Sequence, residues 1–320
     1  MFDKSINAYF LILFSLIPIS IILGPSISLI NILLIDFSFI FLILSKKDFS
    51  FLRTKTMKYL LVLYLYLVFN SLISLDYTSG LYRNLGFIRM IILFVAFNYF
   101  FKQILFFNKI FTVWLITLFI IIADIFWESY MGVNILGFGG DIYGRRIVSF
   151  FKDEPIVGGF VNSFYLIMIG FLFNKSKGDY KNTILIISVI FLFAILLTGE
   201  RANSIRALMG LLVFYSLLRE YELKKRIIFL FSILTLVFVL IINSEYLKLR
   251  FLDQTQSYLT KNQIYFNLYK SGFEVFKNHK LFGVGNKNYR VETCVKKEIS
   301  KKTIKSYICT THPHQIYFET

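Results

Sequence analysis

The sequence predicts an all-α integral membrane protein, a polytopic bundle of about nine to ten helices with one large loop outside the membrane. Hydrophobic side chains make up 57% of the 320 residues and charged ones only 17%, whereas a soluble domain has about 25% charged residues. The mean hydropathy is +0.66, and the apolar residues gather in runs nearly long enough to cross a bilayer. A water-soluble globule is therefore excluded.

Nine apolar stretches are expected to be the membrane helices. Each has 15 to 18 residues in its strictly apolar part, and a span needs about 20, so interfacial Tyr, Asn or Ser residues must complete it. No small-residue cleavage site follows Leu23, which indicates a retained first helix rather than a signal peptide. The stretches are 8–23, 27–44, 59–75, 87–101, 110–126, 156–173, 183–198, 204–218 and 227–242.

The basic residues predict the orientation. With a cytoplasmic N-terminus, the segments inside the cell hold 15 Lys or Arg residues and the short outside loops hold 6, as the positive-inside rule requires. The formal net charge of +16 is then explained by topology and the lipid bilayer. No nucleic acid is expected as a partner.

Nine crossings divide the chain into three parts. Residues 1–242 form the transmembrane bundle, 243–315 form one large extracytoplasmic loop, and the apolar run 316–320 begins a further helix at which we expect the sequence to be cut. The loop contains all three histidines and both cysteines, so we expect the chemistry on the outer face.

Three features of this loop carry structural predictions. Cys294 and Cys309, fifteen positions apart in an oxidising compartment, are expected to form a disulfide worth about 3 kcal/mol; two unpaired buried cysteines are the alternative. Aromatic residues at helical spacing predict a helix that lies on the membrane surface or packs on its own loop: Tyr265, Tyr269, Phe273 and Phe276. The Gly283-Val284-Gly285 segment is typical of a tight turn.

Four polar segments interrupt the apolar pattern on the expected outer face. Arginine matches phosphate oxygens bidentately, and a neutral imidazole can accept a proton from a sugar hydroxyl. Each residue alone is more typical of an interfacial anchor or a surface turn, but together they suit sugar transfer from a lipid-pyrophosphate donor. The segments are GRRIVSFFKDEPIVGGF with Arg145, Arg146, Asp153 and Glu154; TGERAN with Glu200, Arg201 and Asn203, followed by Arg206; HKLFGVGNKNYR with Arg290; and THPHQIYFE with His312, His314 and Gln315.

No metal or cofactor is expected at these segments. They contain no closely spaced DxD carboxylate pair, and Asp153 and Glu154 are adjacent, so their side chains point in different directions. Two further acidic residues lie within apolar stretches. Asp36, at mid-membrane, has no partner that the sequence identifies and must be protonated, paired or in a polar cavity. Asp124 is expected to reach water at the outer end of its helix.

The order of FKDEPIVGGF, TGERAN, NHKLFGVGNKNYR and CTTHPHQIYFE resembles the bacterial O-antigen ligase and polymerase family over about 140–320. The resemblance implies a glycosyltransferase fold of the C type and metal-independent transfer of an undecaprenyl-pyrophosphate-linked glycan on the periplasmic face of the inner membrane. By motif, it implies His314 as the base and Arg146, Arg201 and, more weakly, Arg290 as pyrophosphate ligands; Glu200, Asp153, Glu154 and Gln315 would support them.

The acceptor stays open. Lipid A core would make the enzyme a ligase, a second lipid-linked glycan a polymerase, and a Ser or Thr side chain a protein glycosylase. The glycines that the family has some ten residues after the His would fall beyond residue 320. The alternative from another class is a transporter or channel, but such proteins tend to place ionisable residues at mid-membrane, where this sequence has only Asp36.

Overall fold

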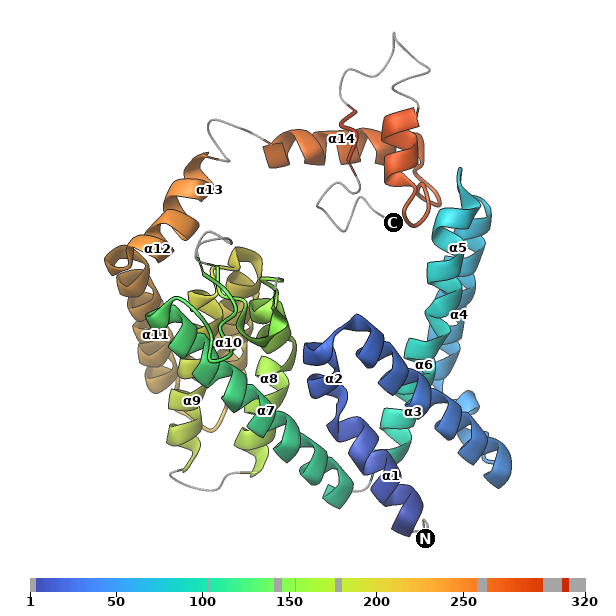
Figure 1. Ribbon diagram of the computed structural model, residues 1–320, viewed down its shortest axis with the longest axis horizontal. Coiled ribbons are helices and arrows are strands. Elements are labelled where there is room, and N and C mark those ends of the chain that lie inside the picture. The colour runs from blue at the N-terminus through green and yellow to red at the C-terminus, as the bar shows by residue number, and fades with distance from the viewer. Residues whose placement is uncertain are drawn as a thin grey trace. The chain divides into compact units, whose positions relative to one another are not determined.

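The computed structural model describes residues 4–102, 104–140, 146–152, 154–175, 180–257, 264–295 and 307–310. Over these residues the secondary structure is helical, and the only β pairing is an isolated bridge between Val133 and Gly139 (Figure 1). The prediction of an all-helical membrane protein is confirmed at this level. The chain divides into two compact units, Met1–Asn31 with Gln103–Thr255 and Ile32–Lys102 with Gln256–Thr320.

The first unit is a helical bundle. Within it α8 packs against α9 and α10, and α7 packs against α1 and α9 (Figure 1). The helices are α1 (Lys4–Ser15), α2 (Ile17–Leu23), α7 (Ile104–Met131), η3 (Ser149–Phe151), α8 (Val157–Lys175), α9 (Tyr180–Leu197), α10 (Arg201–Leu217), α11 (Leu223–Asn243), α12 (Glu245–Lys248) and η4 (Leu249–Asp253), and α13 (Gln254–Ser257) crosses the boundary between the units.

Several buried polar groups of the first unit pair with one another across helices, as an apolar surrounding favours. The Tyr165 hydroxyl donates to the Ser188 carbonyl at 2.9 Å, and the hydroxyls of Ser188 and Tyr215 lie 3.2 Å apart. These contacts join α8, α9 and α10. The Trp114 indole N–H donates to the Phe14 carbonyl at 2.9 Å and fastens α1 to α7.

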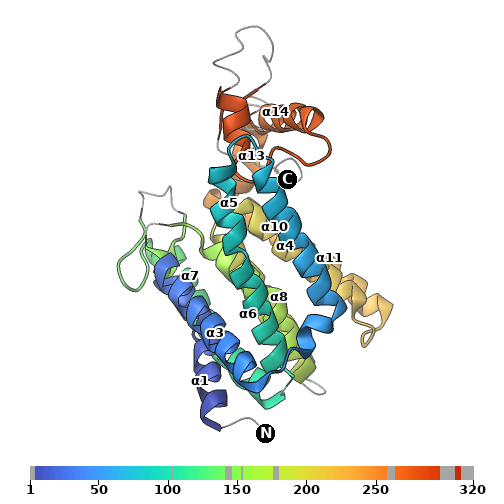
Figure 2. The ribbon, with the colours of Figure 1, turned by 90° about the vertical axis from the view of Figure 1, so that its right-hand side faces the viewer.

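The second unit contains a helical hairpin and the region around the disulfide. Figure 2 shows α4 alongside α5. Asp76 caps the N-terminus of α5 by accepting from the Thr78 and Ser79 amides. The elements are α3 (Pro25–Lys46), which crosses the boundary between the units, η1 (Ser50–Arg53), α4 (Lys55–Leu72), α5 (Tyr77–Gly86), α6 (Ile88–Phe100), α14 (Ile264–Asn278) and η6 (Val291–Val295).

Every apolar stretch found in the sequence falls on a helix. Within the described residues five helices are long and apolar enough to cross a membrane, and the pair α1 and α2, bent by 43°, would be a sixth. The five are Pro25–Lys46, Tyr77–Phe100, Phe106–Met131, Val157–Lys175 and Leu223–Asn243. Helices α4, α9 and α10 cover the three remaining apolar stretches of the sequence but are not among these candidate membrane spans. Nine crossings therefore stay a prediction.

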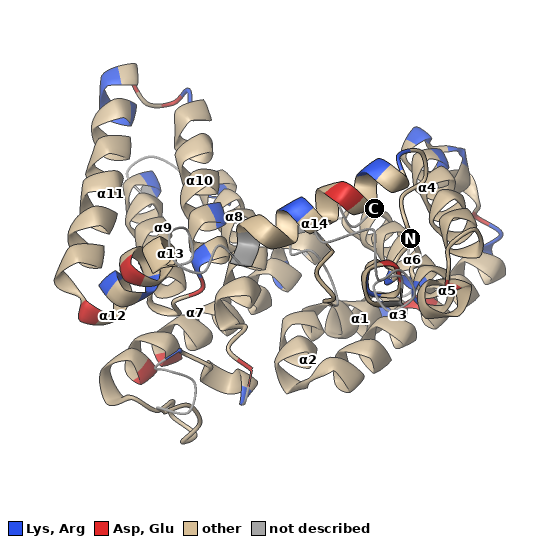
Figure 3. Ribbon diagram, turned by 90° about the horizontal axis from the view of Figure 1, so that it is seen from above, with Lys and Arg blue, Asp and Glu red and all other residues tan. Residues whose placement is uncertain are grey.

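The charged residues follow the helix boundaries. In Figure 3 the bundle helices are mostly uncharged and Lys and Arg lie mainly at helix ends and connections, whereas α14 carries charges along its length. One face of α14 buries Leu268, Ser271 and Val275. Its aromatic residues Phe273 and Phe276 are exposed. The buried face suits a helix that packs on its own loop, and the exposed aromatic face suits a helix that lies on the membrane surface. Both interpretations of α14 therefore stay open.

Candidate functional site

The TGERAN turn and Arg146 lie at one end of the first unit, where α7, α9 and α11 end and α8 and α10 begin. The Glu200 carboxylate joins two of these helices. Its Oε1 accepts from the Gly158 amide at 2.7 Å and its Oε2 from the Gly159 amide at 3.1 Å. These amides lie in the first turn of α8, where N–H groups have no partner within the helix and the macrodipole favours an anion. Glu200 therefore closes the α8 N-terminus.

This cap depends on a close approach of the two segments. A Cβ added at Gly158 would lie 2.4 Å from Thr198 Oγ1 and 2.9 Å from Glu200 Oε1. The amide of Asn203 also donates to Glu200 Oε2 at 2.6 Å. The glycines of the IVGGF segment are thus needed for contact with the turn before α10.

Two residues beyond α11 hold the same turn. Gly199 has φ +70°, in the left-handed region, and its carbonyl accepts from Arg250 Nε at 3.3 Å and Nη2 at 3.1 Å. The Tyr246 hydroxyl donates to the Thr198 carbonyl at 3.4 Å. Helix α12 and its π-helical continuation η4 thereby bring a guanidinium and a phenol to the turn.

Arg201 begins α10 on the other side of this turn. Its Nη1 donates to the Thr255 hydroxyl at 3.4 Å. Arg250 Nη1 donates to the side-chain amide oxygen of Gln254, four residues later in the chain, at 2.7 Å. The segment 246–255 therefore carries Arg250 and also contacts Arg201. Arg206, one turn and a half into α10, is exposed and donates only a long bond of 3.4 Å to Asn203.

The loop that carries Arg146 is fastened to α7 by two buried carboxylates. Glu128 accepts from the Val148 amide at 3.0 Å and the Ser149 amide at 2.7 Å. Asp124, one turn earlier, accepts from the Ile135 amide at 3.0 Å and from the Ser149 hydroxyl. Asp124 is fully buried, so the expectation that it reaches water is wrong: it binds the loop instead.

Successive amides around Ser149, which has φ +50°, form an anion-binding nest of the kind seen in phosphate loops. Here the anion is Glu128, just as the anion at the α8 N-terminus is Glu200. These two backbone anion sites are thus filled by the chain's own carboxylates. A diphosphate bound at either of them would need other donors, such as the arginines.

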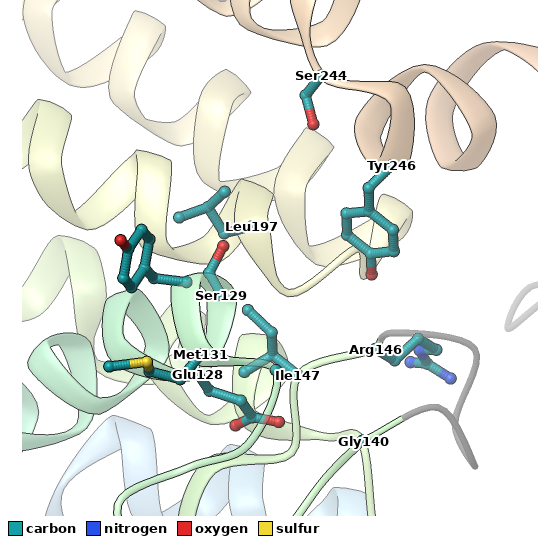
Figure 4. Close-up of a pocket in the computed structure, with 11 residues that line it drawn as sticks. Glu128, Ser129, Met131, Gly140, Arg146, Ile147, Leu197, Ser244 and Tyr246 are labelled. Carbon is teal, nitrogen blue, oxygen red and sulfur yellow. The ribbon is translucent and has the colours of Figure 1, made fainter.

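A cavity of about 390 Å³ opens beside these elements. Figure 4 shows Arg146 and Tyr246 on its wall, with Glu128 and Ile147 beside them. Arg146 Nη2 donates to the Pro155 carbonyl at 2.9 Å, while its Nε is buried without a hydrogen-bond partner. Burial raises the pKa of the Tyr246 hydroxyl, and the guanidiniums of Arg250 and Arg146 oppose this shift. The phenol therefore stays a neutral donor.

The HKLFGVGNKNYR segment lies in the second unit, where asparagines hold it against the α4–α5 connection. The Asp76 amide donates to Asn288 Oδ1 at 2.7 Å, and Asn288 Nδ2 donates back to the Asp76 carbonyl at 3.0 Å. Gly283 and Gly285 both have positive φ, as a tight turn requires. Arg290 ends the segment and its side chain is exposed.

A disulfide joins Cys294 and Cys309, with their Cα atoms 4.7 Å apart. Next to it, Glu292 is fully buried, with its Oε1 3.4 Å from His279 Nε2. The Tyr307 hydroxyl donates to Glu292 at 3.3 Å and accepts from Asn278 at 2.7 Å. The disulfide therefore lies next to a buried polar cluster of Asn278, Glu292 and Tyr307.

The structure brings some candidates together and leaves others apart. Arg146, Arg201 and Glu200 share one end of the first unit, whereas the exposed Glu154 is not part of the cavity wall. Arg290 belongs to the second unit. Five candidates and the predicted further helix at 316–320 lie outside the described residues: Arg145, Asp153, His312, His314 and Gln315. Among the residues described, no three His, Cys, Asp or Glu side chains gather as a metal site would require.

Sequence reasoning missed three residues of this site, Glu128, Tyr246 and Arg250, and assigned the wrong surroundings to Asp124. Only Asp124 and Glu128 left a signal, because two carboxylates lie four positions apart at the end of an apolar helix. Asp36, which had no partner identifiable from sequence, interacts electrostatically with Arg89 of α6.

Comparison with known protein families identifies a match in the C-terminal part of the chain. Residues 186–320, which include the TGERAN turn, the Tyr246 and Arg250 segment and the disulfide, match the model of the O-antigen ligase family. This part of the chain belongs to the O-antigen ligase family. No curated protein and no solved structure matches the chain. The family match does not favour a transporter or channel.

Proposed function

We propose that this protein is a bacterial inner-membrane glycosyltransferase that moves an undecaprenyl-pyrophosphate-linked glycan to an acceptor sugar on the periplasmic face. The observation that carries the proposal is the set of guanidiniums at one end of the first unit. Arg146 lines the cavity with Tyr246, and both Arg146 and Arg250 act electrostatically on that phenol. The O-antigen ligase match over 186–320 supports the same chemistry.

In the proposed reaction, His314 accepts the proton of the acceptor hydroxyl as the hydroxyl oxygen attacks the anomeric carbon of the donor. A carbon–oxygen bond to the acceptor forms, and the bond to the diphosphate breaks, leaving its electron pair on the phosphate oxygen. Arg146 and Arg201 stabilise the charge that grows there. Arg290 is proposed as a further ligand. No metal ion is assigned a role.

The roles of the acidic residues differ. Glu200 and Glu128 each accept two backbone amides, so we assign them to positioning the arginine-bearing turn and loop. Asp153, Glu154 and Gln315 are proposed to support the site. The acceptor is lipid A core or a second lipid-linked glycan.

Surface polysaccharide on a gel tests this function. A deletion strain carrying Arg201→Ala or His314→Ala at normal abundance should lose long-chain glycan, while Arg206→Ala should keep it. Loss of chain length with lipid A core still capped by one repeat would indicate a polymerase, and uncapped core a ligase. Unchanged glycan in both variants would reject the proposed site.

A further inference from the structure

A second cavity, of about 620 Å³, lies in the second unit away from the arginines. It is formed where α3 ends, η1 and α4 begin and α6 ends. Both α3 and the Tyr77–Phe100 span are long and apolar enough to cross a membrane. A cavity at the ends of two spans is expected near the depth of the lipid head groups.

The apolar part of the wall of this cavity is largely aromatic. It includes Phe51, Phe94, Tyr99 and Phe101. Phe39 of α3 contacts the rings of Phe51 and Tyr99, with ring centroids 6.3 and 5.5 Å apart, and so supports two sides of the wall. A cavity of this size and lining is typical of a site for a molecule with a sizeable apolar part.

Charges of both signs stand on the same wall. Asp48 and Lys102 both line the cavity. Hydrogen bonds from Ser50, one of them from its amide to Asp48 Oδ1 at 3.1 Å, lower the pKa of Asp48, and Lys102 and Lys46 act in the same direction. The carboxylate is therefore ionised at neutral pH, beside an ammonium.

From this arrangement we infer that the cavity binds a zwitterionic aminophospholipid such as phosphatidylethanolamine. The primary ammonium of the lipid donates to the Asp48 carboxylate, its phosphate pairs with Lys102, and the start of an acyl chain lies against the aromatic wall. An anionic lipid would bring its phosphate to Lys102 but has no ammonium of its own to offer Asp48. A choline head group has no N–H to donate to the carboxylate.

Native mass spectrometry of the purified full-length protein tests this inference. The protein is equilibrated with equal amounts of phosphatidylethanolamine, phosphatidylcholine and phosphatidylglycerol that share the same acyl chains, and the retained lipid is identified. We expect phosphatidylethanolamine to be retained about fivefold more than either competitor, as for one partly exposed ion pair. Asp48→Asn and Lys102→Met should each remove this preference.

Lys58→Met is the matched control, because Lys58 is an exposed cation of the same basic segment but does not line the cavity. It should leave the preference unchanged. Asp48→Asn keeps an acceptor for the Ser50 amide, so the fold is preserved, which an unchanged melting temperature without added lipid verifies. Equal retention of the three lipids, preference for one of the competitors, or a preference that survives both variants would overturn the inference.

Discussion

The Gly158 amide donates to Glu200 Oε1 at 2.7 Å, and this bond connects the start of α8 to the turn that carries Arg201. The acidic residue of TGERAN therefore stabilises the framework on which the arginine stands. Its own charge is balanced by the amides of the α8 N-terminus.

Loss of this cap should destabilise the protein without removing a positive charge. Glu200→Ala leaves two helix amides without their acceptor and is expected to cost about 1 to 3 kcal/mol, measured as a lower melting temperature in detergent. Glu222→Ala is the control, because Glu222 precedes α11 but makes no side-chain cap hydrogen bond. Equal melting temperatures for the two variants would contradict the capping role.

The Glu128 carboxylate should determine the position of the loop that carries Arg146. Glu128→Ala leaves the Val148 and Ser149 amides buried without an acceptor, a cost of about 2 to 5 kcal/mol. We expect faster limited proteolysis between 134 and 149 and a lower rate of transfer. Glu222→Ala, which removes an exposed carboxylate before α11, should match wild type in both assays; unchanged cleavage in Glu128→Ala would contradict this assignment.

The disulfide should stabilise the folded segment around η6. Replacing both Cys294 and Cys309 by Ser removes a crosslink across fifteen positions, worth about 3 kcal/mol on the chain-entropy model. Reductant should lower the melting temperature of wild type but not of the double variant. Alkylation of both cysteines in unreduced native protein would show that the bond is absent.

Tyr246 should act as a neutral donor over the working pH range. Burial raises its pKa above the usual value of 10.0, so the folded protein holds the proton more tightly than the unfolded chain. The hydroxyl therefore loses its function as a donor only as the pH rises through the raised pKa. Tyr246→Phe is expected to lower transfer about tenfold at every pH from 7 to 9. A Tyr246-dependent step in the wild-type profile below pH 9 would contradict this.

The fold could be predicted from the sequence where the signal is local. Apolar runs mark the helices because a span must be apolar along its length, and a fifteen-residue spacing in an oxidising compartment suggests a cysteine pair. Two reciprocal hydrogen bonds between Asp76 and Asn288 join residues 212 positions apart. No periodicity in the sequence indicates this contact. The same holds for the Arg250 contact with Gly199, since nothing in the sequence after α11 indicates which earlier turn it meets.

The central claim is that Arg146 and Arg201 hold the diphosphate of a lipid-linked donor, and transfer by the purified full-length protein tests it most directly. With a lipid-pyrophosphate glycan as donor, Arg146→Ala and Arg201→Ala should each lower kcat/KM about 100-fold, while the exposed Arg206→Ala stays close to wild type. Wild-type kcat/KM in Arg146→Ala and Arg201→Ala, or an equal loss in Arg206→Ala, would contradict the account.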